Sequence, residues 1–262
     1  MHTLGPPPET TVPHRLVHLL QHAVDRLLPP GCAACEEPAL FERAFCAICE
    51  EDSYLLPSSV CPGCALPLPL SRSPYASLPS LAGCPGCARR PHSPITRTTA
   101  IWEYEGAVSE ALRRIKYSGD LVAAQSLLNV SATLIAPTLR ALPPSLIIPV
   151  PARRENLRQR GFHLPSLLAR CWAKGTHHQP ALFALYKTRQ TRAQASLGLI
   201  ERSTNLRDAF KARLTPRPRT SALLVDDVLT TGATLDAAAN ALREAGVEKI
   251  HALVLARSLP RQ

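Results

Sequence analysis

The sequence of 262 residues has little charge, few glycines and no long uncharged apolar run. Charged residues make up 19% of the chain and there are only 12 glycines, so the composition is not that of a disordered protein. Because no window of about 18 residues is both apolar and uncharged, we expect no transmembrane helix. The N-terminus also lacks the order of basic region, apolar core and small-residue cleavage site, so we expect no secretory signal and a cytoplasmic protein.

Cysteines are numerous for a cytoplasmic chain, in which thiols stay reduced. Eight of the nine form C-x-x-C knuckles within residues 32–87. The pairs are Cys32 with Cys35, Cys46 with Cys49, Cys61 with Cys64, and Cys84 with Cys87. A redox motif or a disulfide does not explain four repeats, whereas two knuckles supply the four thiolates of a tetrahedral Zn²⁺ site. We therefore predict two structural zinc ions, with sequential pairing of the knuckles as the simplest arrangement and a crossed pairing still open.

The remaining composition indicates three parts. Residues 1–30 form a proline-rich tail and an amphipathic helix at 13–28, for which packing on the protein is favoured over a membrane-surface role. The double zinc ribbon occupies 31–94, and its folding energy should come from zinc because so small a segment has little core. Residues 95–262 form an α/β domain. The 26 prolines indicate long loops, and 45% apolar content suffices for a core.

Within 95–262, strand-like and helix-like segments alternate, which predicts a mostly parallel, doubly wound sheet. The expected strands are 98–105, 145–150, 182–186, 221–226 and 249–256, and the expected helices are 107–118, 121–139, 164–173, 198–208 and 235–245.

The stretch 223–235, LLVDDVLTTGATL, carries the strongest ligand signal. Asp226 and Asp227 are adjacent carboxylates at the end of a buried strand, where open α/β sheets bind ligands. Backbone N–H groups, hydroxyls and a helix N-terminus then suit a phosphate, and they come from Thr230, Thr231, Gly232, Ala233 and Thr234. The alternatives are a divalent-metal carboxylate site and a solvated strand end.

This stretch resembles the loop that binds 5-phosphoribosyl-1-pyrophosphate in type I phosphoribosyltransferases. The resemblance implies that the two carboxylates hold the ribose hydroxyls and that the loop 230–234 holds the 5′-phosphate. Mg²⁺ would bridge the hydroxyls and the pyrophosphate of the same ligand.

Basic residues are concentrated beside this loop in the sequence. Residues 150–220 contain 15 Lys and Arg and three acidic residues, an excess of 12 positive charges, so we expect a polyanionic ligand such as pyrophosphate, a nucleotide or a nucleic-acid strand. A rigid exit at 149–151 leads to Arg153, Arg154, Arg158 and Arg160, whose planar guanidinium groups suit pyrophosphate. The polar segment 187–210 is interpreted as a mobile lid.

Taken together, residues 16–257 resemble the ComF family. The motifs that carry the resemblance are the paired knuckles, Lys116-Tyr117, Pro149-Val150-Pro151, Arg160-Gly161-Phe162, Arg189, Thr191, Gln194, Leu197, Arg202, Asn205, Phe210 and the stretch LLVDDVLTTGAT. The implied fold is a type I phosphoribosyltransferase-like, mostly parallel sheet at 95–262 with an N-terminal zinc-ribbon module.

The resemblance also implies a role and partners. ComF proteins serve natural transformation in the cytoplasm, where they help single-stranded DNA cross the inner membrane beside a helicase and recombination-mediator proteins. Peripheral association with the uptake machinery follows from that role. The residues expected to contact pyrophosphate or DNA are Arg153, Arg154, Arg160, Lys116, Arg189 and Gln194.

The sequence departs from the family after Gly161-Phe162, where the family continues with Asn-Gln and this chain has His163-Leu164. A helix-start or loop-ordering role for His163 is favoured over a catalytic base. Two hypotheses of function follow: a magnesium-dependent transferase that displaces pyrophosphate, and a non-catalytic adaptor for single-stranded DNA on the same fold. A salvage enzyme for a free base is weaker, since no base-recognising hood is recognisable.

Overall fold

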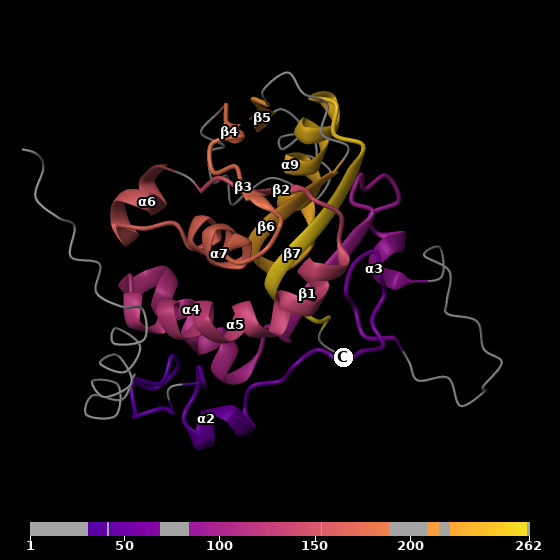
Figure 1. Cartoon of the computed structure of the whole chain (residues 1–262). Helices are drawn as coiled ribbons and strands as arrows, with labels where there is room; N and C mark the ends of the chain where they lie inside the picture. The colour runs from indigo at the N-terminus through magenta and orange to yellow at the C-terminus, as the bar shows by residue number, and fades with distance from the viewer. Residues whose placement is uncertain are drawn as a thin grey trace, which may run out of the picture.

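A parallel sheet lies at the centre of the molecule (Figure 1). Its strand order is β1-β7-β6-β2-β3, and each neighbouring pair is parallel. The bounds are β1 Arg97–Glu103, β2 Leu146–Pro149, β3 Gln179–Pro180, β6 Ser221–Leu229 and β7 Lys249–Arg257. The predicted mostly parallel sheet is therefore confirmed.

The structure is a computed structural model that describes residues 31–40, 42–68, 84–152, 154–188, 209–214 and 221–260. The helices expected at 13–28 and 198–208 lie outside the described residues.

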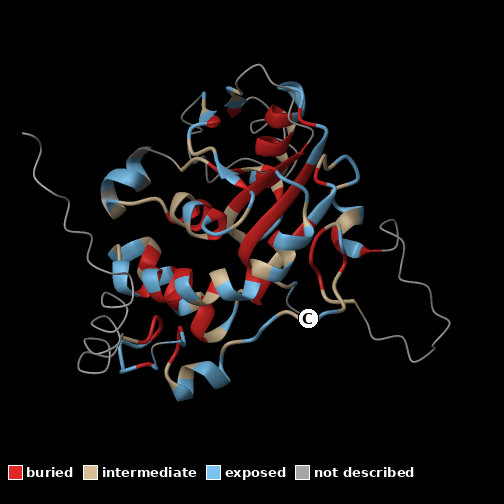
Figure 2. Ribbon diagram, viewed as in Figure 1, coloured by how far each residue is buried: buried red, intermediate tan, exposed pale blue. Residues whose placement is uncertain are grey.

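Helices cover both faces of the sheet because the strands are apolar on both sides. On β6, Leu223 and Val225 join the cluster that contains α4 (Gly106–Ser118), α5 (Leu121–Ala141) and α7 (Leu164–Ala173). The alternating residues Ala222 and Leu224 join the cluster that contains α9 (Ala233–Glu244). Figure 2 shows the buried residues concentrated in the strands and in the sheet-facing sides of these helices.

Several elements differ from the sequence-based prediction. The strand expected at 182–186 is β4 (Leu185–Lys187), which pairs antiparallel with β5 (Phe210–Ala212) outside the main sheet. Strands β3 and β5 have two and three residues, too short for a period-two signal. The stretch 154–160, which was not among the expected helices, is helix α6 (Arg154–Arg160), because Arg, Glu, Leu and Gln favour helix although few residues of the stretch are apolar.

The cysteine-rich segment lies along the outer edge of β1. It contains the short helices α2 (Ala47–Glu51) and α3 (Pro85–Ala88). Leu56 N donates to Ile101 O at 2.9 Å, and Glu103 N donates to Tyr54 O at 2.8 Å, so the link between the knuckle pairs covers an edge that would otherwise be unpaired. The three-part division, with boundaries after residues 30 and 94, stays a prediction.

Among the described residues, α5 has the length and hydropathy of a membrane span. Residues 121–139 of this helix carry no charge, and their Leu, Ile, Val and Ala content gives a sufficient mean hydropathy despite six Gln, Ser, Asn and Thr residues. The expectation that no helix spans a membrane stays a prediction. Core helices of soluble proteins meet the same criterion. One face of α5, including Leu127, Ile135 and Leu139, is buried in the core cluster beside the sheet.

Candidate functional site

The two carboxylates lie on β6 near its carboxyl end. The strand continues to Leu229, three residues beyond the expected end, because Val228 and Leu229 still pair with β7. Asp227 N donates to Asp226 Oδ1 at 2.9 Å, and Val228 N donates to Asp227 Oδ1 at 2.8 Å. These local hydrogen bonds fix both side chains at the edge where the strand enters the loop 230–234.

The end of α4 brings a cation to this pair. Gly119, in the left-handed conformation at φ 65°, ends α4, and Asp120 starts α5 by accepting a hydrogen bond from Ala123 N at 2.9 Å. This turn leaves Lys116 in the last turn of α4, where its Nζ lies 3.0 Å from Asp227 Oδ2. The structure thus joins two residues that the sequence separates by more than 100 positions.

Arg160 reaches the same place from α6. Its Nε donates to the backbone oxygen of Lys116 at 2.6 Å, so the guanidinium holds the end of α4 beside the carboxylates. Arg153, Arg189 and Gln194 lie outside the described residues, as does the side chain of Arg154. Their predicted contacts with pyrophosphate or DNA stay predictions.

Electrostatics set the protonation of the carboxylate pair. Burial, and then the charge of Asp227, raise the pKa of Asp226 to about 8. The N–H of Asp227 and the cations Lys116 and Lys187 act in the opposite direction without cancelling that effect. The raised pKa of Asp226 favours its protonated form near neutral pH, while the neighbouring Asp227 side chain lies beside Lys116.

His163 adjoins the site at the start of α7. It occupies the N-cap position without capping a backbone N–H, and its Nδ1 lies 2.7 Å from Ser166 Oγ. Burial lowers the pKa of His163, although the charge of Asp227 raises it. A neutral His163 ring that is hydrogen-bonded to the side chain of Ser166 fits the interpretation that His163, which replaces the family's Asn, orders the start of α7 and the loop before it.

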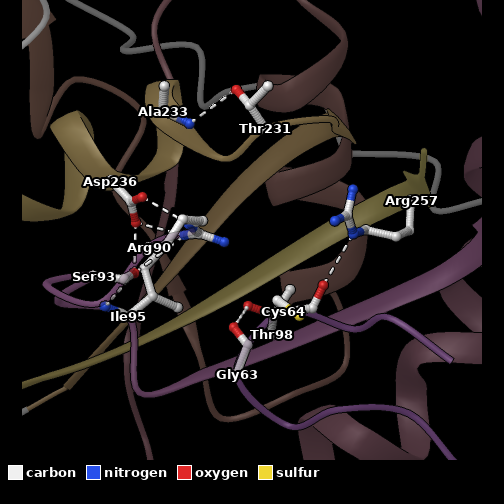
Figure 3. Close-up of polar contacts among 10 residues, drawn as sticks. All are labelled: Gly63, Cys64, Arg90, Ser93, Ile95, Thr98, Thr231, Ala233, Asp236 and Arg257. Atoms are coloured by element: carbon white, nitrogen blue, oxygen red, sulfur yellow. Dashed lines mark hydrogen bonds and ion pairs between the residues drawn. The ribbon is translucent and has the colours of Figure 1, made fainter. Parts of the chain in front are cut away.

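The loop 230–234 connects β6 to α9. Gly232 has φ 87°, a conformation that L-residues with a side chain rarely adopt, and it forms the N-cap of α9. Asp236 N donates to Gly232 O at 2.8 Å, and Ala233 N lies 3.4 Å from Thr231 Oγ1 (Figure 3). Thr230, Thr231 and Thr234 are exposed, so hydroxyls and the positive end of a 12-residue helix are accessible at one place.

The two cysteine tetrads have the geometry of zinc sites. The knuckles pair sequentially: Cys32, Cys35, Cys46 and Cys49 form the first tetrad, and Cys61, Cys64, Cys84 and Cys87 form the second. Within each tetrad the sulfur atoms lie within 4.8 Å of one another. The Sγ atoms of Cys61 and Cys87 are 3.5 Å apart and those of Cys64 and Cys84 are 3.4 Å apart. Tetrahedral Zn–S bonds of about 2.3 Å place sulfurs about 3.8 Å apart, whereas a disulfide needs about 2.05 Å, so both tetrads could hold zinc.

Local backbone features explain how the knuckles form. Glu36 and Ala65 follow the second cysteine of their knuckles, and both adopt positive φ, at 69° and 54°. Gly86 in Cys84-Pro85-Gly86-Cys87 is needed for another reason, since a Cβ there would lie 2.6 Å from Cys64 Sγ. The second tetrad closes only because this knuckle has no side chain at that position.

A set of polar contacts between the second tetrad and the loop 230–234 was not predicted from the sequence. Figure 3 shows Arg90 and Ser93 beside Asp236 of α9, and Arg257 beside the backbone of Cys64. The sequence signal was an arginine directly after the apolar run 252–256 of β7.

Comparisons with known proteins agree with this architecture. A family model described as "Phosphoribosyl transferase domain" matches residues 190–261, which include the carboxylate pair and the loop. "DNA utilization protein YhgH" from Shigella flexneri is 30% identical over 238 residues, covering 89% of this chain and 100% of that protein. "Competence protein ComFC" from Bacillus subtilis is 26% identical over 155 residues, 58% of this chain and 60% of that protein. "Competence protein F" from Haemophilus influenzae is 32% identical over 117 residues, 44% of this chain and 51% of that protein.

Proposed function

The chain belongs to the ComF family, and from that premise we propose that it binds phosphoribosyl pyrophosphate with Mg²⁺ and supports uptake of single-stranded DNA in natural transformation. The observation that carries the ligand proposal is the placement of Asp226 and Asp227 immediately before an exposed loop at the N-terminus of α9. A cytoplasmic site of action is part of the proposal.

Each part of the site suits one part of this ligand. The carboxylates accept hydrogen bonds from the ribose 2′- and 3′-hydroxyls, and the N–H groups and hydroxyls of 230–234 bind the 5′-phosphate. Lys116, whose Nζ lies 3.0 Å from Asp227 Oδ2, supplies a cation for the pyrophosphate. Mg²⁺, when bound, would neutralise negative charge on the pyrophosphate.

The same site fits a transfer reaction. The bond between ribose C1 and the pyrophosphate oxygen would break, a nucleophile would bond to C1, and pyrophosphate would leave with the electron pair. Positive charge around the leaving group would provide the main stabilisation. Binding of phosphoribosyl pyrophosphate precedes transfer to any acceptor, so binding is measured first.

Calorimetric titration of the zinc-replete protein with phosphoribosyl pyrophosphate and Mg²⁺ tests the proposal. The double variant Asp226→Ala, Asp227→Ala should lose binding. A matched control is Glu244→Ala, Glu248→Ala, which removes two exposed carboxylates at the opposite end of α9. No binding by the unmodified protein, or equal binding by the Asp226, Asp227 variant, would show that the loop is not a working ribose-phosphate site.

A second candidate function is a non-catalytic adaptor for single-stranded DNA. It is favoured by the excess of 12 positive charges in 150–220 and by relatives named for DNA utilization and competence. Phosphate contacts by arginines would dominate such binding, and the helicase and recombination-mediator partners implied by the family would then receive the strand.

Fluorescence anisotropy with a labelled oligonucleotide at several salt concentrations tests this function. The affinity should fall steeply with salt, and Arg153→Ala, Arg154→Ala and Arg189→Ala should each reduce the salt slope by about 0.7. Arg243→Ala, on the exposed end of α9, serves as the control. Binding that is absent, or that does not change with salt, contradicts an electrostatic DNA site.

A further inference from the structure

The second cysteine tetrad is joined to the proposed phosphate loop by a nearly buried ion pair. Arg90 follows Cys87 by three residues, and its Nε and Nη2 donate to the two carboxylate oxygens of Asp236 at 2.7 and 2.5 Å. The Arg90 side chain is 9% exposed and that of Asp236 is 20% exposed. Two parallel charge-assisted hydrogen bonds fix both orientation and distance, and Asp236 belongs to the first turn of α9.

The position of Arg90 depends on the knuckle that precedes it. Arg90 N donates to Cys87 O at 2.8 Å, so its backbone continues the turn that holds the last ligand of the tetrad. Ser93 supports the same contact, because its Oγ donates to Asp236 Oδ1 at 2.5 Å and lies 3.1 Å from Arg90 Nη2. A displaced Cys87 would therefore displace the guanidinium that holds α9.

The Arg90 guanidinium also lies against the loop itself. A Cβ placed on Gly232 would fall 2.5 Å from Arg90 Cζ and 2.7 Å from Nη1. The guanidinium thus fills the space that a side chain would take behind the turn of 230–234. Gly232 is needed both for its positive φ and for this approach.

Arg257 makes a second connection at the other end of the loop. Its Nε donates to Cys64 O at 3.0 Å, and its Nη1 donates to Leu229 O at 2.8 Å and to Thr230 O at 2.7 Å. The residue is 6% exposed, so these carbonyls replace water around the buried charge. One guanidinium therefore bridges a cysteine of the tetrad and the first residue of the loop.

We propose that Arg90 and Arg257 are positioning residues through which metal in the second tetrad sets the geometry, and hence the ligand affinity, of the loop 230–234. This inference rests on the proposed function, because it concerns how ligand affinity at the proposed ribose-phosphate site is regulated. Among the described residues, the buried cluster at the second tetrad is small: it consists of Cys61, Cys64, Cys84 and Leu66, with Leu68, Cys87 and Leu259 packed against it. Without metal, the folding of this small cluster loses its main source of free energy. The contacts of Arg90 with Cys87 and of Arg257 with Cys64 would then no longer be held in place.

The first tetrad provides an internal comparison. Its contacts lead to α4: Ala107 N donates to Asp52 O at 3.1 Å, and Arg114 Nη2 donates to Glu36 Oε1 at 2.9 Å. Cys32 and Phe45 also belong to the large core cluster beside α4 and α5. Metal in the first tetrad is therefore not expected to act on the loop.

The first experiment measures affinity for phosphoribosyl pyrophosphate with Mg²⁺ by calorimetry in the full-length, zinc-replete protein. Arg90→Met should weaken binding about tenfold, within the range typical of coupling between sites, while the zinc content stays at the unmodified level. Arg89→Met removes a neighbouring exposed arginine and should bind normally. If Arg90→Met binds as tightly as the unmodified protein, the inference is wrong while the proposed function stands. If the unmodified protein does not bind, the proposed function fails instead.

Amide hydrogen exchange tests the connection without any ligand, using zinc occupancy as the variable. Cys87→Ser should increase exchange in 229–237, whereas Cys49→Ser, the matching change in the first tetrad, should not. Arg90→Met should reproduce the increase with zinc retained, which separates the connection from general unfolding of the Cys87 variant. Unchanged exchange in 229–237 for both Cys87→Ser and Arg90→Met would overturn the inference.

Discussion

The ammonium group of Lys116 lies 3.0 Å from Oδ2 of Asp227, so the carboxylate proposed to bind ribose is already paired with a cation from α4. Both side chains are largely buried, at 24% and 15% exposure. A ligand that brings hydroxyls to Asp227 and pyrophosphate to the same place would exchange this ion pair for new contacts of both partners. The pair therefore places a cation within reach of both Asp227 and an incoming pyrophosphate.

Replacement of Lys116 should weaken ligand binding. Lys116→Met removes a cation that we expect to contact pyrophosphate, so affinity for phosphoribosyl pyrophosphate with Mg²⁺ should fall at least about tenfold, as for loss of a hydrogen bond to a charged group. It should also raise the pKa of Asp226 further, since Lys116 acts to lower it. Lys174→Met, at the exposed end of α7, is the control in the same titration. Equal affinities in the two variants would remove Lys116 from the site.

Ligand binding should depend on pH through Asp226. Its pKa of about 8 means that the ligand-free carboxyl is protonated at lower pH, whereas an ionised carboxylate is the better acceptor for ribose hydroxyls. Binding must then release a proton, so affinity should rise about tenfold per pH unit up to about pH 8 and level off above it. Titrations in two buffers with different ionisation heats would detect that proton. Affinity without pH dependence in this range would contradict the assignment.

The same group should make folding stability fall as pH rises. The pKa of Asp226 is raised in the folded protein from the ordinary value of 3.8 to about 8, so between these values the folded state binds more protons than the unfolded chain. The free energy of unfolding therefore decreases through this range. Asp226→Asn cannot ionise, so above pH 8 it should melt higher than the unmodified protein by about 2–4 °C for each kcal/mol that ionisation of the buried Asp226 costs, with no gain near pH 4. Glu248→Gln, an exposed change, should show neither effect. A lower melting temperature for Asp226→Asn at high pH would disprove the buried-charge explanation.

Zinc stoichiometry should report the two tetrads separately. We expect two zinc ions per chain by elemental analysis, and one in Cys46→Ser, which removes a ligand from the first tetrad. Cys171 lies on α7 and belongs to neither tetrad, so Cys171→Ser should retain both ions. Chelation should lower the melting temperature of the unmodified protein because the described residues around the second tetrad share only a small buried cluster. A single zinc in the unmodified protein would mean that one tetrad is not a zinc site.

The sequence alone predicted the features that depend on residues close together in the chain. The C-x-x-C spacing defines each knuckle, and a short apolar run followed by Asp226 and Asp227 defines the strand and its ligand edge. The bounds of α7, expected at 164–173, match because Pro165 and the apolar period mark them. Contacts such as Arg90 with Asp236 were not predicted, since these residues are 146 positions apart and a charged side chain in a loop carries no periodic signal. The pairing of Lys116 with Asp227 was missed for the same reason, although both residues had been selected as candidates.

Two glycines, Gly232 and Gly246, have nearly the same backbone conformation. Comparing alanine substitutions at the two positions therefore separates the cost of backbone strain from the cost of a clash with Arg90. Gly232 has φ 87° and Gly246 has φ 89°, so alanine at either position meets a similar backbone penalty, about 1–2 kcal/mol. No atom of the described residues lies within 4 Å of a Cβ at Gly246, whereas a Cβ at Gly232 would lie 2.5 Å from Arg90 Cζ. Gly232→Ala should therefore lower the melting temperature more than Gly246→Ala and should also weaken ligand binding, because Arg90 must leave Asp236.

A double-mutant cycle completes this comparison. With Arg90→Met as background, Gly232→Ala no longer meets a held guanidinium, so its cost in melting temperature should shrink to that of Gly246→Ala in the same background. The interaction between the two substitutions then measures how strongly Arg90 supports the loop. Additive effects of Arg90→Met and Gly232→Ala would show that the close approach at Gly232 has no energetic consequence, and the loop would owe its shape to β6 and α9 alone.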